Sequence, residues 1–169
     1  MAETFGRVLM VGGTAMLAGV AQYLAPRSER LVLACRRPLE LAAQIGADPI
    51  ALDWTDEASI APLLEQEFDL VISWLHAEGL WLTGLLEETL VPGGRSIRVH
   101  NSKSVDAAVR DGLDPAPRGD ISRQIAVLAW DQYRGSRRWL TNEKIVGGVI
   151  ELIQAPETAL LIIGEHLYD

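Results

Sequence analysis

The sequence predicts an α/β protein built on a doubly wound parallel sheet of about seven strands, with helices on both faces. Two observations carry this prediction. Short apolar runs alternate with segments of helical periodicity over the first hundred of the 169 residues. The first apolar run also ends in a glycine pair, Gly12-Gly13, directly before a helical pattern. Such alternation is typical of parallel sheets, whose ligands bind at the carboxyl ends of the strands.

The first unit of the chain has the pattern strand, glycine turn, helix, strand. Val8 to Val11 is apolar, Met16 to Leu24 has helical periodicity, and Leu31 to Cys35 is apolar again. Gly12-Gly13 permits positive φ angles, and the free N–H groups that open the next helix can bind a phosphate. A nucleotide-binding, Rossmann-like unit is therefore the first hypothesis. Since the strict GxGxxG motif is incomplete, a plain turn is the alternative.

Two arginines, Arg36 and Arg37, follow the second predicted strand. An NAD site usually has a carboxylate there, about 20 residues past the glycines, whereas the 2′-phosphate of NADP calls for arginine. A guanidinium binds phosphate with paired hydrogen bonds and also stacks on adenine. The sequence therefore favours NADP as the cofactor. In the alternative interpretation, the arginines face solvent and open a helix in which Pro38 takes an early position.

The alternation continues to about residue 99. Gly46 is expected to end the second helix, Thr55 to cap the third, and Val91-Pro92-Gly93-Gly94 to close the fourth. The predicted helices cover residues 38–46, 56–67 and 77–90, and the predicted strands cover 49–52, 68–74 and 96–99.

Beyond residue 104 the pattern lapses and then returns. We expect a short helix over 105–110 and a turn-rich loop over 111–120, which is either a lid over the site or a connector. Thr141 is expected to cap a helix that runs from Asn142 to Ile153. The other predicted elements are a strand over 123–130, a hairpin turn at 133–136 with its second strand at 138–140, and a last strand over 159–163.

Composition limits the classes of protein and partner. The chain is 49% hydrophobic with five tryptophans, which suits one compact domain over 1–169. Its net charge of −8 argues against nucleic acid or an anionic membrane as a partner. The single cysteine, Cys35, leaves neither a disulfide nor a zinc site, and we expect no metal. We expect a cytoplasmic protein that acts on a small-molecule substrate, and a homo-oligomer stays open.

The run VLMVGGTAMLAG, residues 8–19, resembles the VxxTGGTGxxG turn of the short-chain dehydrogenase/reductase family, with Ala15 and Ala18 at glycine positions. The likeness covers about the first hundred residues. The later run Arg138-Trp139-Leu140-Thr141, with its helix, is similar to a short bacterial subgroup of that family.

The resemblance implies a role for each matching residue. It implies that the turn residues line the cofactor pyrophosphate, that the arginines bind the adenosine phosphate, and that later strand ends contact the adenine and the nicotinamide-side ribose. The turn residues are Gly12, Gly13, Thr14, Ala15 and Met16, and the arginines are Arg36 and Arg37. The residues expected to contact the adenine are Asp53 and Trp54, and those expected beside the nicotinamide-side ribose are Ser73 and Trp74.

The chain departs from the family at its catalytic residues. The family has a YxxxK pair on the helix after the fifth strand and a serine at the end of that strand. Ser102 and Ser104 stand in the serine position, but Tyr23, Tyr133 and Tyr168 have no lysine four residues later. The resemblance therefore supports cofactor binding, in an atypical short branch, and leaves proton transfer without its usual residues.

Other side chains after the fourth and fifth strands are candidates for proton transfer. His76 and His100 have a suitable intrinsic pKa, and Lys103 beside Ser102 can be tuned by its surroundings. Each can instead be a capping or packing residue, and Lys103 can simply bind the cofactor ribose. The proposed set is His76, Ser102 and Lys103.

Three functions fit these residues to different degrees. An NADP-dependent oxidoreductase is the first, and a non-catalytic NAD(P)-binding sensor is the alternative that the missing YxxxK pair favours. An S-adenosylmethionine methyltransferase is opposed by Arg36 and Arg37, because such enzymes generally place a carboxylate at the end of the second strand.

Overall fold

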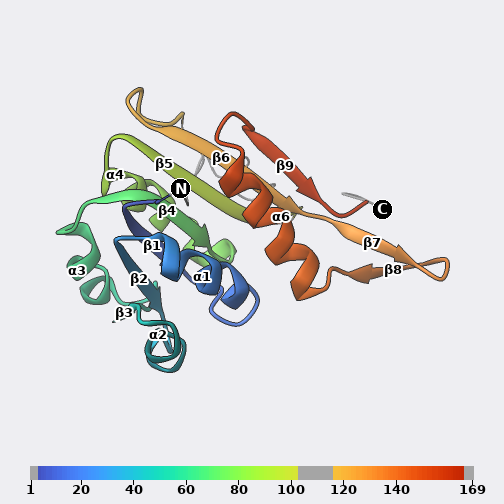
Figure 1. Ribbon diagram of the computed structural model, residues 1–169, viewed down its shortest axis with the longest axis horizontal. Helices are drawn as coiled ribbons and strands as arrows, with labels where there is room; N and C mark the ends of the chain where they lie inside the picture. Colours follow the sequence, from blue (N-terminus) through green and yellow to red (C-terminus); the bar gives the residue numbers. More distant parts are fainter. Residues whose placement is uncertain (1–3, 103–115, 166–169) are drawn as a thin grey trace.

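A computed structural model describes residues 4–102 and 116–165. Its centre is an all-parallel sheet of seven strands in the order β3-β2-β1-β4-β5-β6-β9, and β7 and β8 form a separate antiparallel hairpin (Figure 1). The predicted Rossmann-like α/β fold is therefore confirmed. The chain runs outward from β1 to β3 and then returns to the other side of β1 with β4. Ligands of such sheets bind at this reversal, outside the carboxyl ends of the strands.

The elements have the following bounds. The strands are β1 Arg7–Val11, β2 Arg30–Cys35, β3 Asp48–Ala51, β4 Phe68–Trp74, β5 Leu90–Asn101, β6 Ser122–Leu128, β7 Trp130–Tyr133, β8 Ser136–Trp139 and β9 Leu160–Ile163. The α-helices are α1 Ala18–Leu24, α2 Leu39–Ile45, α3 Ala61–Leu64, α4 Leu82–Glu88 and α6 Asn142–Gln154, and three short 3-10 helices are η1 Ala25–Arg27, η2 Glu57–Ser59 and η3 Ala77–Gly79.

Helices cover both faces of the sheet, and each face has its own core. On one face, buried side chains of α1 and α6 pack together, including Val20 and Val149. On the other face, α3 and α4 contribute residues such as Leu63 and Leu86. The close packing of α1 on α6 depends on Gly19, because a Cβ there would lie 2.9 Å from the Val146 side chain.

The helix predicted over 56–67 is replaced by two short pieces, η2 and α3. Asp56, rather than Thr55, caps the first piece, since its carboxylate accepts from the N–H of Ala58 at 3.1 Å. Pro62 has no N–H group and cannot continue a helix from η2, but it fits the first turn of a new one. The prediction for this segment was therefore wrong in both its continuity and its cap.

The helix predicted over 77–90 is also shorter, because it divides into η3 and α4 and ends at Glu88. Leu90 already belongs to β5, which pairs with β4 and carries an irregularity between Leu90 and Arg95. The Val91–Gly94 run therefore lies within a strand instead of closing a helix. Gly93 has a φ of 81°, which suits a bulged strand.

The last third of the chain follows the prediction more closely. Thr141 caps α6 through Oγ1, which accepts from the N–H of Lys144 at 3.3 Å. The predicted hairpin is present, but the strand expected over 123–130 ends at Leu128, and Trp130 begins β7. The expected helix over 105–110 and most of the expected loop lie outside the described residues. No helix in the described part of the chain is long and apolar enough to cross a membrane.

Candidate functional site

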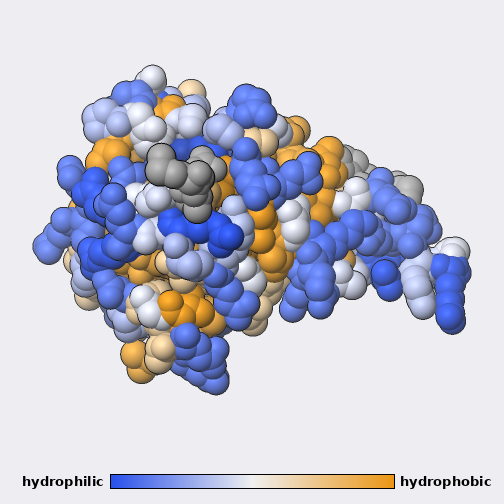
Figure 2. Space-filling view, viewed as in Figure 1, coloured by the Kyte–Doolittle hydropathy of each residue, from blue (hydrophilic) through white to orange (hydrophobic). Residues whose placement is uncertain are grey.

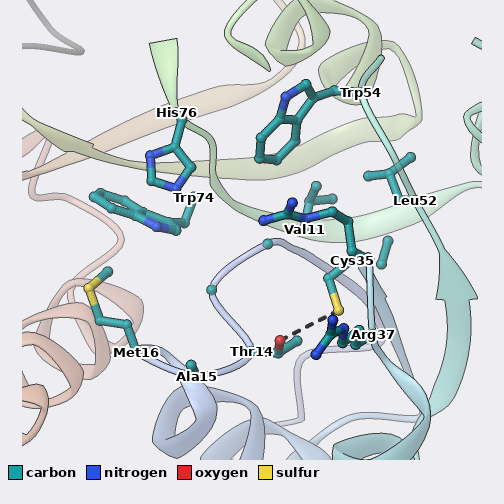
Figure 3. Close-up of a pocket in the computed structure, with 14 residues that line it drawn as sticks. Val11, Thr14, Ala15, Met16, Cys35, Arg37, Leu52, Trp54, Trp74 and His76 are labelled. Carbon is teal, nitrogen blue, oxygen red and sulfur yellow. Dashed lines mark hydrogen bonds between the residues drawn. The ribbon is translucent and has the colours of Figure 1, made fainter. Parts of the chain in front are cut away.

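A pocket of about 500 Å³ lies at the carboxyl ends of β1, β2 and β4, where the strand order reverses (Figure 3). The glycine turn, the residues after β2 and β3, and the residues at the end of β4 surround it. They are Val11, Gly12, Gly13, Thr14, Ala15, Met16, Ala34, Cys35, Arg36, Arg37, Leu52, Trp54, Trp74 and His76. Ten of the fourteen predicted site residues are among them.

The glycine turn requires its first glycine. Gly12 and Gly13 have φ angles of 73° and 68°, in the left-handed region. A Cβ at Gly12 would also lie 2.2 Å from the backbone oxygen of Trp74. The turn therefore packs directly on the end of β4, and only glycine allows this approach.

The turn leaves several N–H groups available to a ligand. Gly12 donates its N–H to Ala34. The N–H groups of residues 13–16 donate to no backbone carbonyl within the described parts of the chain. Helix α1 begins at Ala18 rather than at Met16, so residues 14–17 form a turn in front of it. The expected phosphate donors therefore belong to the turn itself rather than to the first turn of a helix.

Cys35 joins the turn to β2. Its thiol donates to Thr14 Oγ1 at 3.5 Å, a long contact that Figure 3 marks with a dashed line. Sequence reasoning placed Cys35 in a buried strand and gave it no role, although it is adjacent to the two arginines. Leu52 was also missed, because nothing in its own sequence context distinguishes a pocket-lining leucine from a core leucine.

Arg36 and Arg37 lie at the pocket and are exposed to solvent. The guanidinium carbon of Arg36 is 6.0 Å from the centre of the Trp54 ring, at the outer limit of a cation–π contact. Both arginines also line an adjoining pocket of about 380 Å³, which extends over the start of α2 to Pro49 and Ala51 of β3. Both arginines therefore line two separate pockets.

Three aromatic rings form the other wall of the pocket. The His76 ring lies 6.0 Å from the Trp54 ring and 5.9 Å from the Trp74 ring, and it meets Trp74 edge to face. Figure 3 shows His76 between the two indoles, across the pocket from Thr14 and Ala15. The imidazole is thus placed by contacts on both sides and lines the pocket.

Three predicted cofactor or catalytic residues do not line the pocket. Asp53 accepts from the Thr55 hydroxyl and N–H at 2.7 and 2.9 Å, and these bonds hold the pKa of its carboxyl below the ordinary value. Ser73 is buried within β4, where it pairs with Val11 of β1. Ser102 follows β5. Lys103, the remaining residue of the predicted set, lies outside the described residues.

Neither of the described tyrosines, Tyr23 and Tyr133, lines this pocket. Tyr23 lies on α1, where its ring contacts Arg27 and its hydroxyl accepts from Gln154 of α6 at 3.1 Å. Tyr133 lies on the β7-β8 hairpin. Tyr168 and the segment 103–115 lie outside the described residues, so the acid–base candidate that the structure places in the pocket is His76.

No protein-family model matches the sequence, and no curated protein does so either. Solved structures do match. One is BdcA in complex with NADPH, at a TM-score of 0.65 and 15% identity, over 100% of this chain and 98% of that chain. A second is a short-chain dehydrogenase/reductase from Serratia marcescens, at a TM-score of 0.71 and 14% identity, over 99% of both chains.

A third match is L-sorbose reductase from Gluconobacter frateurii complexed with NADPH and L-sorbose. Its TM-score is 0.67 at 10% identity, over 98% of both chains. At such identities the likeness concerns the fold. The chain has the Rossmann-like fold of short-chain dehydrogenase/reductase structures.

Proposed function

We propose that the chain binds NADP in the pocket above the Gly12-Gly13 turn and uses it as an oxidoreductase on a small-molecule substrate. The observation that carries this proposal is that the turn and the arginine pair line one pocket at the reversal of the strand order. Two of the similar structures are complexes with NADPH by their own description.

The residues fit the chemistry of NADP. Unpaired N–H groups of a turn and two exposed guanidinium groups suit a ligand with phosphates at two separate places. A pocket of about 500 Å³ is within the usual range for a cofactor site. Trp54 offers an aromatic face on the arginine side, where the adenine would lie, and Trp74 lies on the β4 side, toward the nicotinamide half.

Bound NADPH would supply a hydride, and a protein group has to supply the proton. His76 fits this task because it lines the pocket and its ring is oriented by Trp54 and Trp74. We assign His76 the role of proton donor in the proposed reaction.

The test of cofactor binding is the double variant Arg36→Ala/Arg37→Ala, titrated with NADPH and NADH by calorimetry. We expect the affinity for NADPH to fall at least tenfold and the affinity for NADH to change much less, because NADH lacks the 2′-phosphate. The matched control is Arg30→Ala at the opposite end of β2, which should leave both affinities unchanged.

Equal losses for NADPH and NADH would contradict the phosphate role of the arginines. Failure of the unaltered protein to bind either dinucleotide would contradict the proposed function as a whole. Binding of S-adenosylmethionine in their place would assign the fold to methyl transfer.

A second candidate function is a non-catalytic NADP-binding sensor. It is favoured by the positions of Tyr23 and Tyr133, which put neither described tyrosine at the pocket. The two candidates differ in turnover alone. A screen of small aldehydes, ketones and quinones for NADPH consumption separates them, since the sensor binds NADPH tightly and consumes none.

A further inference from the structure

A second pocket lies beside the arginine pair, at β3, the strand that forms one edge of the sheet, and we call it the edge pocket. Its volume is about 380 Å³. The residues that line it are Arg36, Arg37, Pro38, Leu39, Glu40, Pro49 and Ala51. The two arginines also line the larger pocket above the glycine turn, and the other five residues do not.

The two pockets use opposite sides of the strand β3. Ile50 and Leu52 pack against the core beneath α3 and α4, and Leu52 also lines the larger pocket. Since successive side chains of a strand point to opposite faces, Pro49 and Ala51 face the side of the sheet that α2 covers. The edge pocket is therefore a separate site that shares its arginines with the larger pocket.

The positive charge at the edge pocket is not neutralised by a close carboxylate. Arg36 and Arg37 form no ion pair within the described residues, whereas Arg30, at the start of β2, pairs with Asp48. Glu40, in the first turn of α2, is the one carboxylate of the lining. Two arginines and one glutamate give the lining a formal charge of +1. An anion is therefore the ligand that this charge favours.

The rest of the lining is aliphatic. Leu39 is 72% exposed, the highest value for any large hydrophobic residue in the described part of the chain. Pro49 and Ala51 are exposed as well. Figure 2 shows apolar surface over α2, at the lower end of the view, directly beside hydrophilic residues. A ligand that covers this surface gains free energy in proportion to the apolar area that it buries.

We propose that the edge pocket binds a small amphipathic carboxylate with an aliphatic chain. The carboxylate accepts hydrogen bonds from Arg36 and Arg37, and the chain covers Leu39 and the exposed side of β3. The inference rests on the proposed function in one respect, because that function assigns the same arginines to the 2′-phosphate of NADP. A bound carboxylate therefore competes with NADPH and hardly affects NADH.

Two other occupants fit the edge pocket less well. A strand of another chain would have to pair with β3, but β3 has four residues and Pro49 offers no N–H. An inorganic anion would pair with the arginines and leave Leu39 exposed. An aliphatic carboxylate uses both the charge and the apolar surface of the pocket, and it needs no backbone pairing.

The first test compares three ligands by calorimetry on the full chain: octanoate, butanoate and 1-octanol. Octanoate should bind most tightly. Butanoate lacks four CH₂ groups, each worth about fourfold in affinity when fully buried, so it should bind at least about tenfold more weakly. Octanol has the same chain length without the charge, and it should also bind at least about tenfold more weakly.

The second test places the ligand in the edge pocket. Ala51→Phe fills the pocket and should abolish octanoate binding, while NADPH binding persists because Ala51 does not line the larger pocket. The matched control is Ala43→Phe on the exposed side of α2, which lines neither pocket and should bind octanoate normally. Far-UV circular dichroism verifies that both variants are folded.

Two changes of charge at the start of α2 give a further check. Leu39→Asp should weaken octanoate binding at least about fivefold by repulsion, and a carboxylate is well tolerated in the first turn of a helix. Glu40→Gln removes the one carboxylate of the lining, so octanoate binding should strengthen by about two- to fivefold. The affinity for octanol should stay the same in Glu40→Gln.

The third test measures competition. With octanoate near saturation, the apparent affinity for NADPH should fall at least about fivefold, because both ligands need the same guanidinium groups. The affinity for NADH, which has no 2′-phosphate, should change less than about twofold.

The proposal is overturned if the unaltered chain does not bind octanoate, or if it binds octanol equally well. Octanoate binding that survives both Ala51→Phe and Leu39→Asp overturns it too, because the ligand then lies elsewhere. An NADPH affinity that octanoate does not lower contradicts the shared arginines. A chain that binds octanoate in the edge pocket and neither dinucleotide would support the pocket and contradict the proposed cofactor function alone.

Discussion

At the scale of single residues, the site depends on where the backbone of one strand meets the turn after another. Gly12 is in van der Waals reach of the Trp74 carbonyl, and the same strand end carries His76 into the pocket. A change at Gly12 therefore moves the glycine turn and the aromatic wall together. The binding loop and the candidate proton donor form one structural unit.

The cost of a Cβ close to Trp74 at position 12 can be measured apart from the cost of a positive φ. Gly12 and Gly46 both have a φ of 73°, but a Cβ at Gly46 would meet nothing within 4 Å. We expect Gly46→Ala to cost about 1–2 kcal/mol of unfolding free energy, the usual penalty for a left-handed alanine. Gly12→Ala should cost clearly more and should also abolish NADPH binding. Urea unfolding measures both, and equal costs would contradict the required approach to Trp74.

His76 is tested by separating binding from turnover. In His76→Gln, we expect NADPH consumption to fall by about 10²–10⁴-fold, which is the usual contribution of a positioned acid or base. The dissociation constant for NADPH should change little, because glutamine retains much of the side chain that lines the pocket. Glu78→Gln, two residues away in η3, is the control and should keep full turnover. Unchanged turnover in His76→Gln removes histidine from the proposed reaction.

The sequence allowed a correct assignment to one site mainly for residues that lie close together in the chain. Gly12 to Met16 and the arginine pair belong to one βαβ unit, whose geometry puts the glycine turn and the end of β2 at one sheet edge. Asp53 and Ser73 also stand near strand ends, but Asp53 binds Thr55, Ser73 is buried, and neither lines the pocket. Side-chain direction depends on local turns and on strand register, which composition and spacing do not determine.

At the scale of elements, strands were easier to predict than helices. The buried strands are apolar runs with clear ends, whereas the two failed helix predictions concern segments interrupted by Pro62 or followed by Val91–Gly94. In both segments the spacing of apolar residues fits a longer helix than the one that forms in the structure. Gly46 and Thr141 correctly marked helix boundaries. Gly46 ends α2 with a positive φ, and the Thr141 side chain accepts a hydrogen bond from the first turn of α6.

A buried ion cluster links α4 to β5 and β6, and no pattern in the sequence predicts it. The Glu87 carboxylate accepts from Arg98 Nε at 2.9 Å and from Arg123 Nε at 2.8 Å. Side-chain exposure is 7% for Glu87 and 1% for Arg98. Burial raises the pKa of Glu87, but the hydrogen bond from Arg123 and the charges of both arginines outweigh it and hold this pKa below its ordinary 4.5.

Removal of this charge should be costly at neutral pH. We expect Glu87→Gln to lower the unfolding free energy by about 3–5 kcal/mol, because it leaves buried guanidinium groups without their carboxylate. Since the folded pKa is lowered, the contribution of Glu87 is complete above pH 4.5 and is lost as the pH falls through the folded value. The difference between the unaltered chain and the variant should therefore shrink on acidification.

The neighbouring Glu88 provides a control for this experiment. It is 69% exposed and lies 3.5 Å from Arg118, so Glu88→Gln should cost less than about 1 kcal/mol at any pH. Urea unfolding at a series of pH values tests both variants. A cost for Glu87→Gln that is small, or that stays constant on acidification, would show that the cluster does not stabilise the fold through its charge.

At the scale of the whole molecule, both cores share the same strands. Along β1, Val8 and Met10 face the core beneath α1 and α6, while Leu9 and Val11 face the core beneath α3 and α4. The same strand ends at the glycine turn of the pocket. Neither core can therefore persist without the strand that also carries the candidate site.

This arrangement predicts one cooperative unfolding transition for a single domain. Urea curves from far-UV circular dichroism and from tryptophan fluorescence should superimpose, because loss of β1 exposes both cores at once. NADPH at a hundred times its dissociation constant should raise the unfolding free energy by about 2.7 kcal/mol, since it binds only the folded chain. An equal concentration of NADH should raise it less if the arginines recognise the 2′-phosphate. Fluorescence and dichroism curves with different midpoints would mean that the pocket unfolds apart from the rest, and the shared-strand argument would then be wrong.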